Sequence, residues 1–405
     1  MLAGCDIEQP VGVSQGASVS RSDERMGTLA KSVSQMEFTV NQADLVKELG
    51  LSQGVVEKKT TIPILSKVLI EARGEAVELT STDLEIGVRS ACPAKVLAEG
   101  SVTVPAKKLL DYVRLLEGGE VTVRLQENFW VQITAKRART RMVGMSRENF
   151  PVLPQMPDVV AHLGAGMLLD MIGKVIFAVS SEESRYTLNG ALLVVRPDSV
   201  IMVATDGHRL AYVEAPYQAG VSSEVRALVG KKAMGELIRL LSQQEDPNSI
   251  LDFGRDESHL FFRAGGRLLI SRLLSGQFPN YEAVIPKENN RVVVLDRDAI
   301  AGALRRVSQF ADERSHAVKL QLATGELKVS SSSSESGESE ETLEAQYEGE
   351  AVQVGFNSQY LLDFLAAMGT GPVRLEFKDE QSAGQLCPAG ADAPQYRYIV
   401  MPMRI

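Results

Sequence analysis

Residues 203–210 read Val-Ala-Thr-Asp-Gly-His-Arg-Leu, and the rest of the chain can be placed outward from this stretch. In its middle, Asp206 and Gly207 separate two apolar runs. This pattern predicts a tight turn between two strands, because glycine accepts a positive φ and aspartate can bond its own backbone. His208 and Arg209 would then stand where the second strand begins.

The last eight residues, 398–405, read Tyr-Ile-Val-Met-Pro-Met-Arg-Ile. This tail is too apolar to extend freely into water, so we expect it to pack against the body of the protein. We expect it to lie beside His208 and Arg209.

The composition is that of an acidic globular protein, with 405 residues, 44% hydrophobic residues and a formal net charge of −9. No apolar run approaches the roughly 20 residues that a membrane helix needs, so we expect no membrane partner. The negative charge argues against a surface that binds DNA everywhere, but it allows a basic stripe on an acidic body. The widely spaced Cys5, Cys92 and Cys387 predict a reduced, cytoplasmic protein.

Residues 1–35 differ from the rest, because they are rich in Ser, Gln, Gly and Val and lack apolar periodicity. A second plausible start follows at Met36. We predict that 1–35 is a disordered extension or a misplaced start.

From Met36 onward, one order of elements occurs three times. Apolar residues three and four apart predict a first helix in each unit, at 41–55, 167–180 and 297–310. A second helix is predicted at 106–116, 231–241 and 358–368. Alternating strands lie between and after the helices, at 68–72, 76–80, 121–125, 192–195, 200–204, 250–253, 318–322, 326–330 and 373–377.

The repeat is about 124 residues long, the distance from Lys107 to Lys231, and a period of this length indicates separate domains. We predict three domains, at 36–155, 156–288 and 289–405. Many strands with two helices per unit predict the α+β class, with antiparallel sheets that carry helices on one face. The Ser- and Glu-rich run 330–341 is expected to be a solvated hairpin loop.

Catalytic motifs are absent from the sequence: it holds no Walker loop, no Gly-x-Gly-x-x-Gly after a strand and no Gly-x-Ser-x-Gly. The four histidines show no metal-ligand spacing, so we expect neither cofactor nor metal. The enzyme alternative is a phosphodiesterase centred on Asp206 and His208.

Basic residues recur on five predicted helices of this acidic chain, and they are Lys47, Lys107, Lys108, Arg114, Lys174, Lys231, Lys232, Arg239, Arg297, Arg305 and Arg306. They suit backbone contact with duplex DNA. Ordinary solvated helix faces are the alternative interpretation. A single Trp disfavours base stacking on single strands.

Ten short runs together resemble the bacterial DNA polymerase III beta subunit family, the DNA sliding clamps. They are MEFTV at 36–40, IPIL at 62–65, TDLE at 82–85, VTVPA at 102–106, RYTLNG at 185–190, ATDGHRL at 204–210, FPNY at 278–281, GFN at 355–357, YLLD at 360–363 and VMPMRI at 400–405. The resemblance covers about nine-tenths of the chain. It implies three repeated DNA-clamp domains, with sheets outside and two helices from each domain lining a ring.

The resemblance also implies a function without catalysis. A head-to-tail homodimer would encircle double-stranded DNA, independently of sequence, and tether the replicative polymerase for processive replication. Clamp-loader and polymerase subunits would bind through short peptides with Leu and Phe anchors. A clamp paralogue with a specialised role is the alternative.

Three sets of site residues are expected, of which the partner-peptide pocket is carried over from the resemblance. The partner-peptide pocket would comprise Leu188, Thr205, Gly207, His208, Arg209, Leu210, Pro279, Val284, Asn357, Tyr360, Ile399, Val400, Met401, Pro402, Met403 and Arg404. The DNA-facing cations would be Lys59, Lys107, Lys108, Lys174, Arg185, Lys231, Lys232, Arg239 and Arg305. Phe310 would lie in the dimer interface. Within the pocket, Arg209 and Arg404 are expected to bind peptide carbonyls or acidic groups.

A chain that starts at Met36 should keep the melting temperature of the full chain to within about two degrees, because residues 1–35 offer no periodic apolar positions to a core. Calorimetry of both proteins measures this. A markedly lower melting temperature of the shortened chain would show that the extension belongs to the fold.

Overall fold

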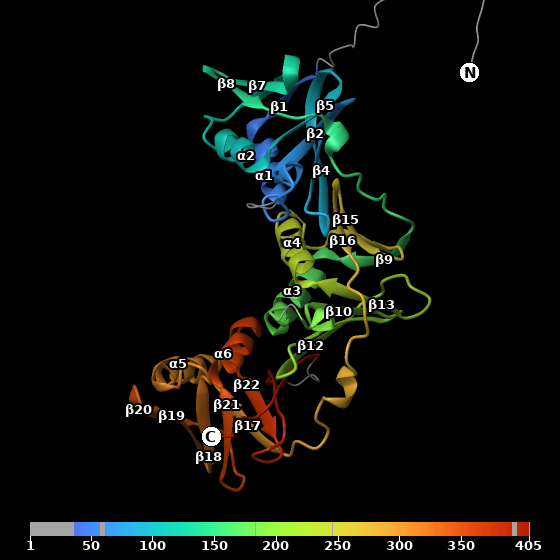
Figure 1. The fold of residues 1–405 in the computed structure, drawn as a ribbon. Coiled ribbons are helices and arrows are strands. Elements are labelled where there is room, and N and C mark those ends of the chain that lie inside the picture. The colour runs from blue at the N-terminus through green and yellow to red at the C-terminus, as the bar shows by residue number, and fades with distance from the viewer. Residues whose placement is uncertain (1–35, 57–60, 183, 245, 391–394, 405) are drawn as a thin grey trace, which may run out of the picture. The chain divides into compact units, whose positions relative to one another are not determined.

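A computed structural model describes residues 36–56, 61–182, 184–244, 246–390 and 395–404 (Figure 1). These residues belong to one compact unit. The predicted extension at 1–35 and the predicted DNA-facing Lys59 lie outside the described residues.

Three pairs of helices recur along the chain, as the apolar periodicity predicted. They are α1 (Gln42–Ser52) with α2 (Ala106–Arg114), α3 (Ala165–Val175) with α4 (Lys231–Leu241), and α5 (Arg297–Val307) with α6 (Ser358–Ala367). Two of the predicted helices end earlier than expected and continue as single 3₁₀ turns, η4 (Ile176–Ala178) and η7 (Ser308–Phe310). Among the helices that the structure describes, none is long and apolar enough to cross a membrane.

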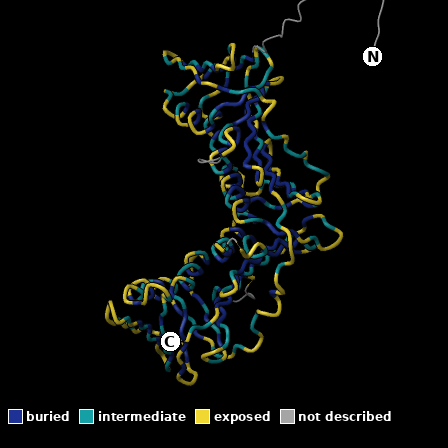
Figure 2. Tube along the Cα trace, viewed as in Figure 1, coloured by how far each residue is buried: buried dark blue, intermediate teal, exposed yellow. Residues whose placement is uncertain are grey.

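The amphipathic pattern of each helix decides which side is buried. In α2, Leu109, Leu110 and Val113 are buried in the core, while Lys107 and Lys108 are exposed. Figure 2 shows buried residues running along the strands and exposed residues at the loops. The basic helix faces are therefore left on the surface by the packing of the apolar faces.

The strands form three sheets, and every strand pair is antiparallel. The first sheet contains β1 (Glu37–Asn41), β2 (Lys67–Arg73), β3 (Ala76–Thr82), β4 (Ile86–Ala98), β5 (Gly100–Pro105), β6 (Glu120–Leu125), β7 (Trp130–Ala135), β8 (Ala138–Val143), β9 (Val159–Gly164), β14 (Ile250–Arg255), β15 (His259–Ala264) and β16 (Arg267–Arg272). The second contains β10 (Gly190–Val195), β11 (Ser199–Thr205), β12 (Arg209–Pro216), β13 (Val225–Gly230), β17 (Arg291–Leu295), β22 (Val373–Phe377), β23 (Gly384–Pro388) and β24 (Tyr396–Val400). The third contains β18 (Ala317–Ala323), β19 (Glu326–Ser333), β20 (Gly337–Glu344) and β21 (Val352–Asn357). The predicted α+β class is confirmed.

Two of these sheets run across the predicted domain boundaries. β4 of the first repeat pairs with β16 of the second, and β12 of the second pairs with β24 at the end of the third. A buried ion pair reinforces the first junction, because the guanidinium of Arg267 bonds both oxygens of Glu48 at 3.0 and 2.5 Å. The boundaries themselves, at 155–156 and 288–289, stay predictions.

The prediction of a solvated loop over 330–341 is wrong. β19 continues to Ser333 and β20 begins at Gly337, so most of the Ser- and Glu-rich run is paired strand. The hydroxyl of Ser331 is buried and donates a hydrogen bond to the carbonyl of Val307 at 2.6 Å. Serine can line a sheet when its hydroxyl finds such a partner, which local composition does not reveal.

Candidate functional site

The stretch 203–210 folds as the predicted turn. β11 ends at Thr205, Gly207 has a φ of 91°, and β12 begins at Arg209. The carboxylate of Asp206 accepts hydrogen bonds from the backbone N–H groups of His208 and Arg209 at 2.9 and 3.0 Å. The carboxylate of Asp206 therefore stabilises the turn. Its hydrogen bond to His208 is to the backbone N–H and not to the imidazole, so it gives no support to the phosphodiesterase alternative.

The carboxyl-terminal tail lies beside this turn, as predicted. β24 pairs with β12 so that Val400 stands opposite Arg209. Beyond the strand, the N–H of Met401 donates to the carbonyl of His208 at 2.9 Å, and the N–H of Met403 donates to the carbonyl of Gly355 at 2.8 Å. The backbone of the tail is thus bonded to the second repeat and then to the third.

A cavity of about 130 Å³ opens where the turn and the tail meet. Ten predicted pocket residues line it, and they are Leu188, Thr205, Gly207, His208, Arg209, Leu210, Pro279, Val284, Ile399 and Met401. Tyr281 also lines it and was not predicted, although it ends the FPNY run that supplied Pro279. We call this cavity the first cavity.

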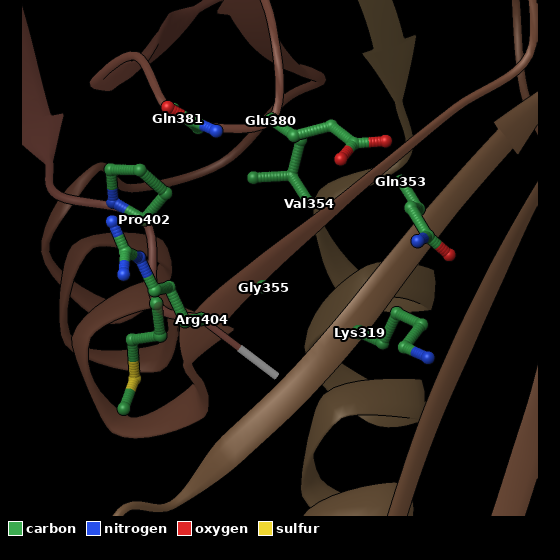
Figure 3. Close-up of a pocket in the computed structure, with 9 residues that line it drawn as sticks. Lys319, Gln353, Val354, Gly355, Glu380, Gln381, Pro402 and Arg404 are labelled. Atoms are coloured by element: carbon green, nitrogen blue, oxygen red, sulfur yellow. The ribbon is translucent and has the colours of Figure 1, made fainter.

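The other six predicted pocket residues do not line the first cavity. Asn357 caps α6, because its side-chain oxygen accepts from the N–H groups of Gln359 and Tyr360 at 2.9 and 3.2 Å. Val400 is fully buried in its strand. Pro402, Met403 and Arg404, which belong to the tail, line a separate cavity (Figure 3).

The sixth, Tyr360, stacks on Arg209, with the guanidinium carbon 4.3 Å from the ring centre. The Arg209 guanidinium donates to the carboxylates of Asp206 at 3.0 Å and Asp363 at 2.6 Å, and to the carbonyl of Phe177 at 2.7 Å. Burial disfavours its charge, but the phenol of Tyr398 and these two carboxylates outweigh burial and raise the pKa of Arg209 above its usual range.

Arg209 therefore joins β12 of the second repeat to α6 of the third. This differs from the expectation that its guanidinium is available to bind peptide groups, since three of its donors are already engaged by the protein itself. The partners that engage it are 32 and 154 residues away in sequence for Phe177 and Asp363, so no local pattern could reveal them.

Three predicted DNA-facing cations gather at one surface. Lys107 and Lys108 of α2 and Arg239 of α4 line a cavity of about 670 Å³ between the first and second repeats. Asp111 lies in the same lining and bonds the ammonium of Lys107 at 2.8 Å. Arg305 is exposed on α5, where no described residue forms an ion pair with it.

Other predicted DNA-facing cations already have protein partners. Lys174 pairs with Asp170 at 2.7 Å, and Arg185 pairs with Glu182 at 2.8 Å. The ammonium of Lys231 lies 3.5 Å from the carbonyl oxygen of Val179.

Lys232 forms a link between repeats. Its ammonium pairs with the carboxylate of Asp83, whose side chain is only 4% exposed. Asp83 belongs to the first repeat and Lys232 lies in the first turn of α4 of the second, so the ion pair crosses the same junction as Glu48–Arg267.

Phe310 lies in η7 beside the tip of the β19–β20 hairpin, and its side chain is 37% exposed. In the described part of the chain, β20 ends its sheet with one edge unpaired, and β8 does the same in the first sheet. The outward face of β8 carries Arg139 and Arg141. That of β20 carries Glu338, Glu340 and Glu344.

Comparison with known proteins gives matches along the whole described unit. Residues 36–154, 163–280 and 282–404 match, in order, the N-terminal, central and C-terminal domains of the DNA polymerase III beta subunit. A beta sliding clamp from Pseudomonas putida is 35% identical over 373 residues, which cover 91% of this chain and all of the relative.

Solved structures agree with these matches. A sliding clamp from Pseudomonas aeruginosa bound to griselimycin is 33% identical, covers 92% of this chain and 100% of its own, and superposes with a TM-score of 0.87. The DNA polymerase III beta subunit from Thermotoga maritima is 27% identical and has a TM-score of 0.85. The match covers 91% of this chain and 100% of the Thermotoga chain.

Proposed function

We propose, because the chain belongs to the DNA polymerase III beta subunit family of sliding clamps, that two copies close head to tail into a ring around duplex DNA and tether a replicative polymerase to it. The observation that carries this proposal is the unbroken order of three clamp domains, each with one helix pair. The clamp is a processivity factor and not an enzyme.

Helix number supports a hole of the right size. Six helices per chain give twelve in a dimer, and axes about 9–10 Å apart would form a circle of roughly 115 Å. Subtracting the helix radius of about 5–6 Å leaves a hole roughly 25 Å across. A duplex about 20 Å wide fits with a layer of water, so the ring could slide without reading bases.

The basic helix faces would supply attraction to phosphates. Lys107, Lys108 and Arg239 suit this role, because they lie together on the exposed helix faces of two repeats. Lys107 and Arg239 also have carboxylate neighbours, Asp111 at 2.8 Å and Glu236 at 3.7 Å. Lys232 suits the role less, because its ion pair with Asp83 links two repeats. Contacts to phosphate alone give affinity without sequence preference.

The edges of β8 and β20, two of the strands that end a described sheet, support closure by a second copy. An exposed sheet edge offers a row of backbone donors and acceptors that another strand can satisfy. β8 is basic on its outward face and β20 is acidic, so pairing β8 of one protomer with β20 of its partner would place opposite charges across the seam. Phe310, beside β20, would add an apolar contact on the helix side.

The first cavity supports the docking of partner peptides. It combines an apolar lining, from Leu188, Leu210, Ile399 and Met401, with the exposed His208. Arg209 would act as a positioning residue, because it ties together the two repeats that form the walls. Replicative polymerase and clamp-loader subunits would insert Leu and Phe side chains here.

Reversing Lys107, Lys108 and Arg239 to Glu should weaken DNA retention and flatten its dependence on salt, because fewer counterions are released on binding. Dissociation from DNA at several salt concentrations measures the slope. The matched control reverses Arg263, Arg272 and Lys378, which line none of these cavities. An unchanged slope in the first variant would show that those helix faces do not meet DNA.

Phe310→Asp should convert the dimer into monomers, because closure would bury a charge without a partner. Sedimentation velocity of the full chain measures this. Ile250→Asp is the control, since Ile250 is 59% exposed and lies in the middle repeat away from both edges. A Phe310→Asp protein that still sediments as a dimer would remove Phe310 from the interface.

Deleting residues 401–405 should lower the affinity for a peptide with a Leu-Phe anchor by at least about tenfold, because a few buried anchors carry most of such affinity. Met401→Asp should have a similar effect while it leaves the backbone bond to His208 available. Val152→Asp is the control, since Val152 is 94% exposed and lies outside the cavity.

Calorimetric titration of the peptide compares the four proteins. Retention on DNA should stay unchanged, because the lining of the first cavity does not include the basic helix faces. Equal affinities for wild type, deletion and Met401→Asp would disprove the docking of peptides in the first cavity.

A further inference from the structure

The turn between β3 and β4, at the junction of the first and second repeats, is built like the turn beside the first cavity. The carboxylate of Asp83 accepts hydrogen bonds from the N–H groups of Glu85 and Ile86 at 2.9 and 2.6 Å. The hydroxyl of Thr82 donates to the carbonyl of Ile86 at 2.8 Å. The turn at 205–209 contains the same three bonds, at 2.9, 3.0 and 2.6 Å. The two turns therefore correspond residue by residue.

The strand that the next repeat adds beside each turn is also placed alike. β16 pairs with β4 at the first junction, and β24 pairs with β12 at the second. The N–H of Arg272 donates to the carbonyl of Glu85 at 2.8 Å. In the same way, the N–H of Met401 donates to the carbonyl of His208 at 2.9 Å. The backbone frame of the first cavity is thus present at both junctions.

At the first junction, the place that corresponds to the first cavity is occupied by Leu153. At the second junction, Leu210 stands opposite Ile399, and both line the first cavity. At the first, Gly87 stands opposite Ile270. The side chain of Leu153 packs so closely on Gly87 that a Cβ atom there would lie 2.7 Å from the Cδ1 atom of Leu153. Leu153 also packs on the apolar cluster that contains Ile270.

Leu153 belongs to a proline-rich segment, residues 151–157, that leads from the first repeat to β9 (Figure 1). We call this segment the strap. It reads Pro-Val-Leu-Pro-Gln-Met-Pro, with a proline at every third position. This spacing is typical of polyproline II, which has three residues per turn, so Leu153 and Met156 lie on the same side of the strap. Both pack on the cluster that contains Ile270.

The strap is held by side chains. No backbone hydrogen bond joins 151–157 to any residue that the structure describes. Its prolines have no N–H to donate, and Val152 is 94% exposed. A segment of this kind can leave the sheet once its apolar side chains are displaced, whereas a paired strand would also have to break its backbone hydrogen bonds.

We propose that the first junction is a second peptide site of the chain, suited to an aliphatic anchor, and that the strap closes it by inserting Leu153 as a built-in ligand. This inference rests on the proposed docking of peptides in the first cavity, because the two sites share one backbone frame. A short tether holds a ligand at an effective concentration on the order of millimolar, so a free peptide at about micromolar concentration does not displace the strap. Each wild-type chain therefore presents one open peptide site.

Leu153→Ala should open the second site. Calorimetric titration of the dimer with the blocked Leu-Phe peptide should give a single bound peptide per chain for wild type and a second one for Leu153→Ala. In a Met401→Asp background, which disables the first cavity, Leu153→Ala should raise the affinity for the peptide at least about tenfold, because the tethered competitor is removed. Val152→Ala is the matched control, since it changes the exposed neighbour and should leave a single site.

Substitution of Leu84 locates the gained site. Leu84 occupies in its turn the position of Gly207, because each donates its N–H to the threonine hydroxyl, at 3.0 and 3.1 Å, and each has a positive φ. Its side chain is 51% exposed. Leu84→Asp, added to Leu153→Ala, should weaken the gained site about tenfold and leave the first cavity unchanged. Leu97→Asp is the control, since Leu97 is 61% exposed at the far end of β4.

A single bound peptide per chain in Leu153→Ala would overturn the inference, as would a gained site that Leu84→Asp does not weaken. If Leu153→Ala does not fold, Met156→Ala decides, because it removes the other anchor of the strap. Met156→Ala should bind a second peptide per chain when the peptide reaches about millimolar concentration, and the absence of that second site would equally overturn the inference.

The two proposals fail in different ways. If a peptide with Leu-Phe binds wild type no better than one with Ala-Ala, the proposed docking in the first cavity fails. If wild type binds the Leu-Phe peptide at a single site and neither strap variant binds more, the docking in the first cavity stands and only the second site is disproved.

Discussion

Backbone hydrogen bonds that cross from one repeat to the next are the interaction on which the rest of the structure depends. β4 pairs with β16, and β12 pairs with β24, so neighbouring repeats share sheets. Side-chain ion pairs such as Glu48–Arg267 then lie at a junction that the backbone already defines. Among the strands that end a described sheet, β8 is basic and β20 is acidic, so a second copy of the chain could pair the two edges.

The pairing of β12 with β24 also forms the first cavity. It brings the last residues of the chain beside the turn at 206–208, which is far away in sequence. Apart from cations paired within one repeat, such as Lys174 with Asp170, two groups can be distinguished. Arg209, Lys232 and Arg267 are engaged across junctions between repeats, whereas Lys108 and Lys319 have no ion-pair partner among the described residues. The first group holds the repeats together, and the second is available to ligands.

Much of the fold could be predicted from local pattern. The periodic apolar residues placed α4 at its observed bounds, and the Asp-Gly pair located the turn between β11 and β12. Ten residues of the first cavity followed from the resemblance of short runs. These features are local, because each is determined by a few neighbouring residues.

What could not be predicted depends on partners distant in sequence. The local sequence predicts that Lys232 is an exposed helix cation. In the structure it pairs with Asp83, which is 149 residues away in sequence. Arg209 reads as a ligand for peptides until Asp363 engages it. The composition of the serine-rich run predicts a loop. In the structure most of the run forms β19 and β20, because cross-strand pairing stabilises strands that the local composition does not indicate.

The central claim is that DNA is held topologically, inside a ring that two copies of the chain close through the edges of β8 and β20. The most direct measurement compares retention of the loaded protein on a nicked circular DNA before and after the circle is cut once. The account predicts stable retention on the circle, rapid loss after linearisation, and restored retention when both ends of the linear DNA are blocked by bound protein. Equal dissociation from circular and linear DNA would contradict it.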